Sequence, residues 1–529
     1  MAKFQRLPPA DPTRETFQMK PDWTTLKVIA IFFLLFAASE SPADSHARST
    51  QARGHLKSET AVPSKSYLRL DEVIHSALQS FPAVLAASKR REMATGEKLA
   101  AEGGFDTIIK MYSRSSLAGQ YQNENVDVGF EQPTEYWGAT FFGGYRRGVG
   151  KYPVYEGKSE TATDGEVRAG VLIPLWRNRD IDRRRANLAQ ADLNQLIAGH
   201  EYDQQLLELE RQATYRYWDW VLAGRRAGIA RHLLDVAKAR NGGLRDRIHL
   251  GDLPAIDATE NQRAVVEREE RLVAAERALE QAAIQLSLFL RTPEGETLLP
   301  SPEDLPQGFP KAKEHHHRPL EELIEDAILK RPEIKRIEIQ IRHAQVESQL
   351  VQNQRLPAVD LTLSGAQDFG ISQSNLVNRS EFYAGVIIDM PVQQRVAEGK
   401  GIAAETNLSR LTAERQLAED RVRNEIRDSV SAIRAAFKRI GLADQQRNLA
   451  RQLEEGEKTK YGLGESNLML VNLRELATGD ASMIYADALN AYHRALADFR
   501  FSSGEFSQLT EDSHHHQHQT IDYDFDPTS

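Results

Sequence analysis

The sequence contains no cysteine, which excludes disulfide bonds, zinc–thiolate sites and lipid attachment at a mature N-terminal cysteine. Its stability must therefore come from packing. Glycine and proline are sparse, with 33 and 21 residues in 529, and 40% of the residues are hydrophobic. This composition excludes a collagen-like or disordered chain and favours long helices. The formal net charge of -9 at pH 7 gives no support to nucleic-acid binding.

The sequence also lacks an apolar run long enough for a membrane-spanning helix. The most apolar stretch, residues 28–38, is too short, because a helix needs about 20 residues to cross a hydrocarbon core of about 30 Å. This stretch follows a basic segment and precedes small residues with candidate cleavage positions near Ala43 or Ala47. We therefore interpret residues 1–47 as a cleaved signal peptide, rather than a retained anchor, and residues 48–67 as a linker.

Catalytic fingerprints are absent as well. The sequence has no HExxH, GxSxG, P-loop or dinucleotide-binding glycine motif, so we expect no enzymatic activity and no cofactor. Two histidine tracts, at residues 315–317 and at 514–516 with His518, carry imidazoles of the kind that bind Zn, Cu or Ni. They lie in proline-rich or polar segments, and we interpret them as solvated tails rather than as a metal site.

What the sequence does contain is an internal repeat. The segment LDEVIHSALQSFP at residues 70–82 returns as LEELIEDAILKRP at residues 320–332, 250 positions later (320 minus 70). Each copy leads through a helix, an alternating β segment, a very long charged helix, a glycine-marked turn and a returning helix. This pattern predicts one body built from two halves. The expected divisions are a first repeat at 68–291, a connector at 292–318, a second repeat at 319–504 and a polar tail at 505–529.

Two stretches, residues 180–248 and 395–462, contain almost no proline and predict unusually long helices. At 1.5 Å per residue, each would reach about 100 Å. A seam of apolar residues spaced four, three, four and three runs through the second stretch, at Ile426, Val430, Ile433, Phe437 and Ile440. Such a 3.5-residue spacing demands a partner helix, and taken alone it is also typical of an ordinary coiled coil.

An alternating β segment precedes each long helix. Every second residue from 167 to 175 is apolar, as is every second residue from 359 to 363, and residues 382 to 390 alternate in the same way. Strands of about 9 to 11 residues with one apolar and one polar face fit a transmembrane barrel, whose closed ladder satisfies every backbone group in lipid. The same alternation also suits an edge of a soluble sandwich.

The number of strands bears on whether one chain can close a barrel. We expect two hairpins, hence four strands, whereas the smallest transmembrane barrels have about eight. Several chains must therefore pool their strands, and three chains would give twelve. Residues 120–165 are aromatic and glycine-rich and leave three interpretations open: an external loop, extra strand length or an interfacial aromatic belt.

Together these features resemble the TolC-type outer membrane efflux proteins over roughly residues 68–504. The resemblance rests on paired features that occur twice in the same order: Ala77-Leu78 with Pro82 and Ala327-Ile328 with Pro332, the strand ends at 171–175 and 386–392, and the turns at 250–252 and 463–465. It implies a mainly α protein with membrane β structure, in which a homotrimer forms a twelve-stranded outer membrane β-barrel continuous with a twelve-helix periplasmic α-barrel.

The resemblance also implies a function. The chain looks like the exit duct of an efflux or secretion machine, located in the outer membrane with a large periplasmic portion. Its implied partners are a periplasmic adaptor (membrane fusion protein), an inner membrane pump and outer membrane lipid. A periplasmic coiled-coil adaptor is the alternative, and a soluble helical enzyme is a third class. An adaptor would normally show one helical hairpin between lipoyl-like β halves, whereas this chain shows two hairpins and twin β insertions.

Each long helix is expected to reverse at a glycine, so both turns should lie together at the periplasmic tip. In the family, residues around these turns contact the adaptor, which carries over to Gly251, Asp252, Leu253, Gly464, Glu465, Ser466, Asn467 and Leu468. Gly251 and Gly464 also suit plain helix caps, where glycine adopts a left-handed conformation at little cost. Docking and capping are compatible roles.

Acidic residues just past each turn often line the channel entrance in the family, and Asp257 matches such a position. Three copies of Asp257 would favour cations and raise one another's pKa, although an aspartate stabilised by the helix dipole explains the residue equally well. Asn472 stands where the second copy often has an acid, which argues against tight cation selectivity. Tyr461 is expected to pack between helices rather than to gate. Pro174 and Pro391 are expected to end strands at the barrel-to-helix transition.

Overall fold

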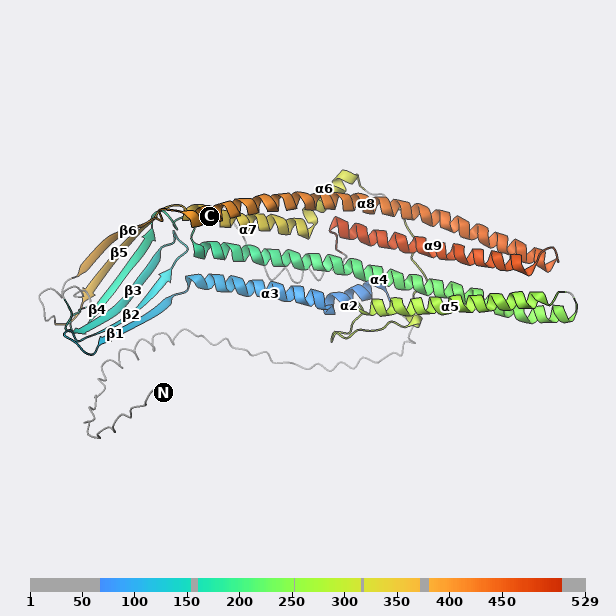
Figure 1. Cartoon of the computed structure of the whole chain (residues 1–529), viewed down its shortest axis with the longest axis horizontal. Helices are drawn as coiled ribbons and strands as arrows, with labels where there is room; N and C mark the ends of the chain where they lie inside the picture. The colour runs from blue at the N-terminus through green and yellow to red at the C-terminus, as the bar shows by residue number, and fades with distance from the viewer. Residues whose placement is uncertain (1–66, 154–159, 252, 315–317, 372–379, 507–529) are drawn as a thin grey trace, which may run out of the picture. The chain divides into compact units, whose positions relative to one another are not determined.

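Two very long helices organise the computed structural model, which describes residues 67–153, 160–251, 253–314, 318–371 and 380–506. They are α4 (Arg183–His249) and α8 (Arg395–Gly462), and they confirm the helices predicted from the scarcity of proline (Figure 1). The expected signal peptide, the two histidine tracts and Asp252 lie outside the described residues.

Shorter helices cover each long helix in two sections. On α4, helices α2 (Leu70–Ser80) and α3 (Pro82–Glu102) lie toward the sheet, and α5 (Ile256–Ser287) lies toward the turn (Figure 1). On α8, helices α6 (Leu320–Lys330) and α7 (Pro332–Gln354) lie toward the sheet, and α9 (Leu468–Ser503) lies toward the turn. Helix α4 also contacts α7 and α9, so the two halves pack on each other. Short 3₁₀ turns follow α3 and lie in the connector, at Gly103–Phe105 and Pro302–Asp304.

Local sequence explains where several helices start. Pro82 and Pro332 occupy the first position of α3 and α7, where a missing N–H costs nothing and the fixed φ favours a helix. The Asp182 carboxylate accepts hydrogen bonds from the backbone N–H groups of Arg184 and Arg185, at 2.7 and 3.1 Å, and so caps α4. At the other end of the chain, Gly504 closes α9 in a left-handed conformation with φ of 67°.

The predicted seam on α8 finds its partner helices within the same chain. Ile426 and Val430 are buried against α6 and α7, in a cluster that includes Leu323, Ile324 and Ile334. Farther along, Ile433 packs with Tyr492 of α9. The demand for a partner helix is therefore confirmed. Among the described residues, no helix is long and apolar enough to cross a membrane.

Within the described residues, the β segments form a single antiparallel sheet of six strands in sequence order (Figure 1). The strands are β1 (Ile108–Ser116), β2 (Asn123–Pro133), β3 (Thr140–Gly150), β4 (Glu166–Pro174), β5 (Ala358–Asp368) and β6 (Glu381–Asp389). The expectation of four strands per chain is therefore wrong, because residues 120–165 contain β2 and β3. The total of twelve strands, which assumed three chains with four strands each, does not follow from this sheet.

The strand register sorts the side chains onto two faces, because residues directly opposite each other in an antiparallel sheet share a face. Leu363 lies opposite both Val171 and Ala384, so the apolar sets predicted in the two copies share one face. We call it the apolar sheet face. It carries Ile109, Met111, Val126, Val128, Phe130, Phe141, Tyr145, Val167, Val171, Ile173, Val359, Leu361, Leu363, Phe382, Val386 and Ile388.

The opposite face, which we call the polar sheet face, carries most of the charges. They are Lys110, Arg114, Asp127, Glu131, Arg146, Glu166, Arg168, Asp360, Asp368, Glu381 and Asp389. On the apolar sheet face, the charged strand residues are Glu124 and Arg147, both near the strand ends remote from the helices. The alternation thus separates an apolar surface from a charged one across all six strands.

Candidate functional site at the helical turns

Both long helices reverse at a glycine held in the left-handed region. Gly251 has φ of 83°, and its N–H donates to the Ile248 carbonyl at 3.0 Å. Gly464 has φ of 81°, and the following N–H, of Glu465, donates to the Lys460 carbonyl at 2.9 Å. A Cβ on either glycine would meet no atom within 4 Å, so backbone conformation rather than space requires glycine. The capping interpretation of both glycines is confirmed.

The other residues of the predicted docking tip differ in what they offer a partner. Glu465 is exposed, Leu253 is half-buried, and the Ser466 hydroxyl donates to the Glu457 carboxylate. The Asn467 side chain caps α9 by accepting from the Leu470 N–H at 3.0 Å.

Leu468 is a correction to the predicted tip, because it is only 1% exposed. A buried leucine packs the helices and offers no surface to an adaptor. The turns expose other apolar side chains instead: Leu250, Ile256, Leu463, Met469 and Leu473, each more than half exposed. Apolar side chains gathered at an exposed end are typical of an interaction surface.

Tyr461 lies where the two turns approach each other. The Arg247 guanidinium of α4 lies over its ring, 5.7 Å from the centroid. Burial raises the pKa of the Tyr461 hydroxyl above 10.0, and the negative charge of Asp257 raises it further. Asp257 lies in the first turn of α5, where the helix dipole also stabilises its negative charge. The two residues therefore interact across the helix pairs α4/α5 and α8/α9.

Asn472, expected at the channel entrance, is buried and only 4% exposed. Its side-chain oxygen accepts hydrogen bonds from Arg240 at 2.7 Å and from Arg268 at 3.3 Å. Both arginines also bind the buried carboxylate of Glu475, in the Arg268 case at 2.8 Å. We call these four residues the tip cluster.

The tip cluster joins three helices at about two helical turns from the start of α9. Arg240 comes from α4, Arg268 from α5, and Asn472 and Glu475 from α9. Lys458 of α8 approaches the same carboxylate at 3.4 Å, which brings in the fourth helix. Arg268 also donates to the Leu233 carbonyl at 2.8 Å. A single carboxylate thus holds both helical hairpins together.

Burial raises the pKa of the Glu475 carboxyl, but hydrogen bonds and charges from Arg240 and Arg268 outweigh it and hold this pKa below its ordinary value of 4.5. Glu475 therefore stays ionised at neutral and mildly acidic pH. Its contribution to stability is present above its ordinary pKa and is lost as the pH falls through the lowered folded value.

Sequence reasoning missed Glu475, Arg240 and Arg268. Asn472 was singled out by its position, while the carboxylate lies one helical turn farther on the same face of α9. Arg268 carried a signal that could have been read: it follows Ala264 and Val265 at helical spacing, where a seam would place an apolar residue. An arginine at such a position needs a buried partner.

The structure also places Pro174 and Pro391 beside the connections from sheet to helix. Pro174 is the last residue of β4, and the chain reaches α4 eight residues later (from 175 to 182). Pro391 lies two residues past the end of β6 and precedes α8. Their lack of an N–H suits the end of a ladder.

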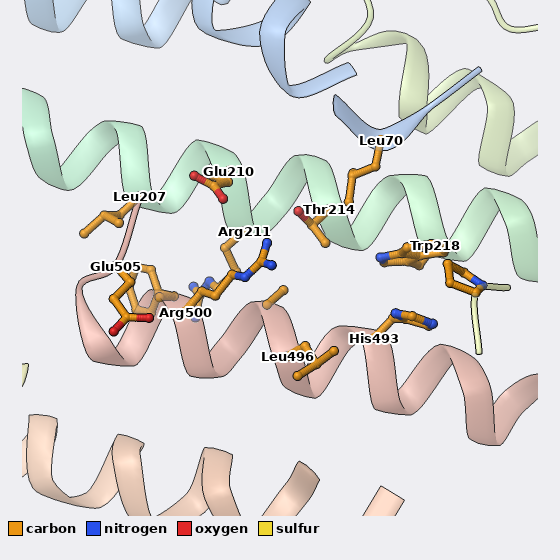
Figure 2. Close-up of a pocket in the computed structure, with 13 residues that line it drawn as sticks. Leu70, Leu207, Glu210, Arg211, Thr214, Trp218, His493, Leu496, Arg500 and Glu505 are labelled. Atoms are coloured by element: carbon orange, nitrogen blue, oxygen red, sulfur yellow. The ribbon is translucent and has the colours of Figure 1, made fainter. Parts of the chain in front are cut away.

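Away from the turns, a recess lies near the middle of the helices, between the facing sides of α4 and α9 (Figure 2). Its volume is about 260 Å³, and Trp218 and His493 form one end of it. The His493 ring stacks on Trp218 with centroids 4.3 Å apart, and Phe309 of the connector stacks on the same tryptophan at 5.5 Å. Trp218 is therefore a packing residue between the helices and the connector.

The buried His493 predicts a dependence of stability on pH. Burial lowers the pKa of this imidazole from 6.5 to about 4, so the unfolded chain takes up its proton before the folded chain does. As the pH falls from 6.5 toward 4, this residue alone should lower the free energy of unfolding, by up to roughly 3 kcal/mol. We expect His493→Phe to reduce the loss of urea stability between pH 7 and pH 5. His232→Phe, at an exposed position of α4, should behave as the unsubstituted protein, and equal losses in all three proteins would contradict this assignment.

Solved structures give the comparisons that bear on this fold. The chain is similar to the outer membrane protein VceC from Vibrio cholerae, at 15% identity and a TM-score of 0.59, over 82% of this chain and 96% of that chain. The MtrE outer membrane channel of Neisseria gonorrhoeae matches at 14% identity and a TM-score of 0.61, over 88% and 97%. The CmeC outer membrane channel of Campylobacter jejuni matches at 11% identity and a TM-score of 0.58, over 91% and 98%.

No protein-family model and no curated protein sequence matches the chain. At identities of 11 to 15%, the three structures establish the fold. The chain has the fold of these outer membrane channels over nearly their whole length. The fold expected from the resemblance to the TolC-type proteins, with long helices joined to a sheet, is thereby confirmed.

Proposed function

We propose that this chain is an outer membrane channel, an exit duct for efflux or secretion whose sheet spans the outer membrane and whose helices extend into the periplasm. The observation that carries the proposal is the sorting of the six strands into an apolar and a charged face. The likeness of fold to outer membrane channels supports it.

The apolar sheet face is suited to lipid rather than to water. Phe382 is 90% exposed, and Ile109, Met111 and Ile388 are each about two-thirds exposed or more. A soluble protein rarely leaves so many large apolar side chains uncovered on one surface. In a barrel wall the same side chains contact hydrocarbon, while the charged face lines a water-filled lumen.

The edges of the sheet require further copies of the chain. In the part of the chain that the structure describes, β1 and β6 each pair with one neighbouring strand, so each presents a row of unpaired backbone groups. In lipid such groups cost several kcal/mol each, and only closure of the ladder removes them. We propose that β6 of one copy pairs with β1 of the next and that three copies close the barrel, as the resemblance implies.

Conductance tests this function directly. The purified protein, reconstituted from detergent into a planar bilayer, is expected to give ion-conducting steps, because the lumen is polar and continuous. Protein that remains in the aqueous phase and gives no steps would count against a channel. The alternative of a periplasmic adaptor is less well supported, since the chain folds as outer membrane channels do and has two helical hairpins.

We further propose that the two turns form the docking surface for a periplasmic adaptor, which couples the duct to an inner membrane pump. The exposed apolar residues at both turns support this proposal. Because both turns follow helices that start at the sheet, they lie at the end of the helices remote from the membrane (Figure 1). That end is where a periplasmic partner would meet the duct.

Substitution at the second turn tests docking. Gly464→Val forces a β-branched residue to φ of 81°, at a cost of about 1–3 kcal/mol, and should distort the turn and lower export while trimers still assemble. Leu463→Asp should lower export without backbone strain, because it places a charge on the apolar surface. Gly456→Val is the control, since Gly456 lies in α8 with open space around it. Full export in both turn variants would contradict docking at this surface.

A further inference from the structure

We propose that β2 and β3 form an additional transmembrane hairpin, so that each copy contributes six strands to the membrane wall and three copies close a barrel of eighteen. The inference rests on the proposed channel function and concerns what the wall is made of. It assigns a membrane position to residues 123–150, for which the sequence alone left open an external loop, extra strand length or an interfacial aromatic belt.

The hairpin is an integral part of the sheet ladder. β2 pairs with β1 over nine residues and with β3 over eleven, and β3 pairs with β4 over seven. Both strands have 11 residues, a length that spans a bilayer when tilted, about 9–11 residues. Since β1 contacts the rest of the sheet only through β2, the barrel cannot include β1 in this register and leave the hairpin outside.

The hairpin also repeats the division into two faces. Val126, Val128 and Phe130 of β2 lie on the apolar sheet face. Through β3, Val128 is in register with Val167 and Phe130 with Ala169. An external hairpin surrounded by water would have no reason to keep this apolar surface continuous with that of β4 and β5. Lipid contact across all six strands explains the continuity.

Three ion pairs on the polar sheet face bind the hairpin to its neighbours. Lys110 of β1 contacts Glu131 of β2, Arg146 of β3 contacts Glu166 of β4, and Arg168 of β4 reaches Asp127 of β2, each at 2.6 Å. The last pair passes over β3, where Gly144 lies directly opposite Arg168 and carries no side chain. Charges of this density need water, so this face is the lumen side.

The turn of the hairpin lies at the helix end of the sheet. A Cβ on Gly138 would lie 2.6 Å from the carbonyl oxygen of Asn178, which precedes α4. Beside it, Tyr136 and Trp137 project outward, 83% and 68% exposed. Aromatic residues with a polar atom favour the headgroup region of a bilayer. We assign this pair to the periplasmic headgroup layer, where Trp176 on the β4–α4 connection is also exposed.

A wall of eighteen strands has a direct consequence for the pore. Barrel diameter grows roughly linearly with strand number at a given tilt, so the barrel should be about one and a half times as wide as one with twelve strands.

The absence of cysteine makes single-cysteine labelling a clean test. The trimer is reconstituted in lipid vesicles and treated with a charged, membrane-impermeant thiosulfonate. We expect Val128→Cys on the apolar sheet face to be protected from the reagent and Asn125→Cys on the polar sheet face to be labelled. Leu363→Cys and Ser364→Cys in β5 are the matched pair outside the hairpin, with the same two orientations.

The matched pair separates two kinds of failure. If Val128→Cys is labelled as fast as Asn125→Cys while Leu363→Cys stays protected, the hairpin lies outside the bilayer and this inference is overturned. If Leu363→Cys is labelled as well, the channel proposal itself fails. Should a cysteine variant not assemble, electron cryomicroscopy of the unsubstituted trimer in nanodiscs decides the question, with eighteen strands expected and twelve strands contradicting the inference.

Discussion

Leu363→Arg is expected to abolish assembly in the outer membrane, whereas Thr362→Arg, one residue earlier, is expected to leave it largely intact. Leu363 lies in the middle of β5 on the apolar sheet face, and Thr362 lies on the polar sheet face. An arginine facing lipid at the bilayer midplane costs about 2–4 kcal/mol, and a trimer carries it three times. On the lumen side the same side chain remains in water.

The measurement is the amount of trimer that resists dissociation by detergent in the outer membrane fraction. Because the two variants carry the same residue at adjacent positions of one strand, differences in synthesis or export should be small. Equal assembly of both variants would mean that one sheet face does not contact lipid while the other contacts water. Such a result would remove the main support for a membrane barrel.

Glu475→Gln is expected to separate the two helical hairpins at the turn end of the channel. It removes the charge that Arg240 and Arg268 share and leaves two guanidinium groups partly or fully buried without a counter-charge. Removing one partner of a buried ion pair typically costs about 3–5 kcal/mol. We therefore expect higher conductance in planar bilayers and faster proteolysis near the turns, with the trimer retained.

Glu276→Gln provides the control for this substitution. Glu276 of α5 pairs with Arg231 of α4 at 2.7 Å, within one helical hairpin rather than between the two, and both side chains are about half exposed. Exposed pairs contribute about 0–1 kcal/mol, so this variant should behave as the unsubstituted protein. Similar conductance and proteolysis in all three proteins would show that the tip cluster does not hold the hairpins.

The helical half of the fold was predictable because its signals are local. Scarce proline over residues 180–248 and 395–462 indicated helices of unusual length, and the apolar spacing on α8 indicated a buried seam. Gly251 and Gly464 marked the turns because few other residues adopt a positive φ without strain.

The strands β2 and β3 remained one of three interpretations of residues 120–165, because glycines weaken their strand signal. Gly129 falls between Val128 and Phe130, and Gly143 and Gly144 stand in the middle of β3, where glycine weakens a strand signal. The reason for these glycines is non-local: neighbouring strands approach so closely that a Cβ on Gly129, Gly143 or Gly144 would lie 2.6 to 2.9 Å from an atom of the facing strand.

The tip cluster was missed for a related reason. Arg268 and Glu475 are 207 positions apart and meet only because α5 and α9 pack together. The sequence placed Asn472 at the channel entrance, whereas the structure buries its side chain against two arginines. Leu468 likewise looked like a surface residue of the turn, and it is a core residue of the helices behind it.

The most direct measurement is the mass of the mature protein with and without detergent, determined by light scattering at matched protein concentration. If β1 and β6 of neighbouring copies pair within lipid, extraction from the outer membrane should require detergent and should yield a stable particle of three chains. A monodisperse single chain that stays soluble in plain buffer would contradict the account, because its sheet would then need neither lipid nor a second copy.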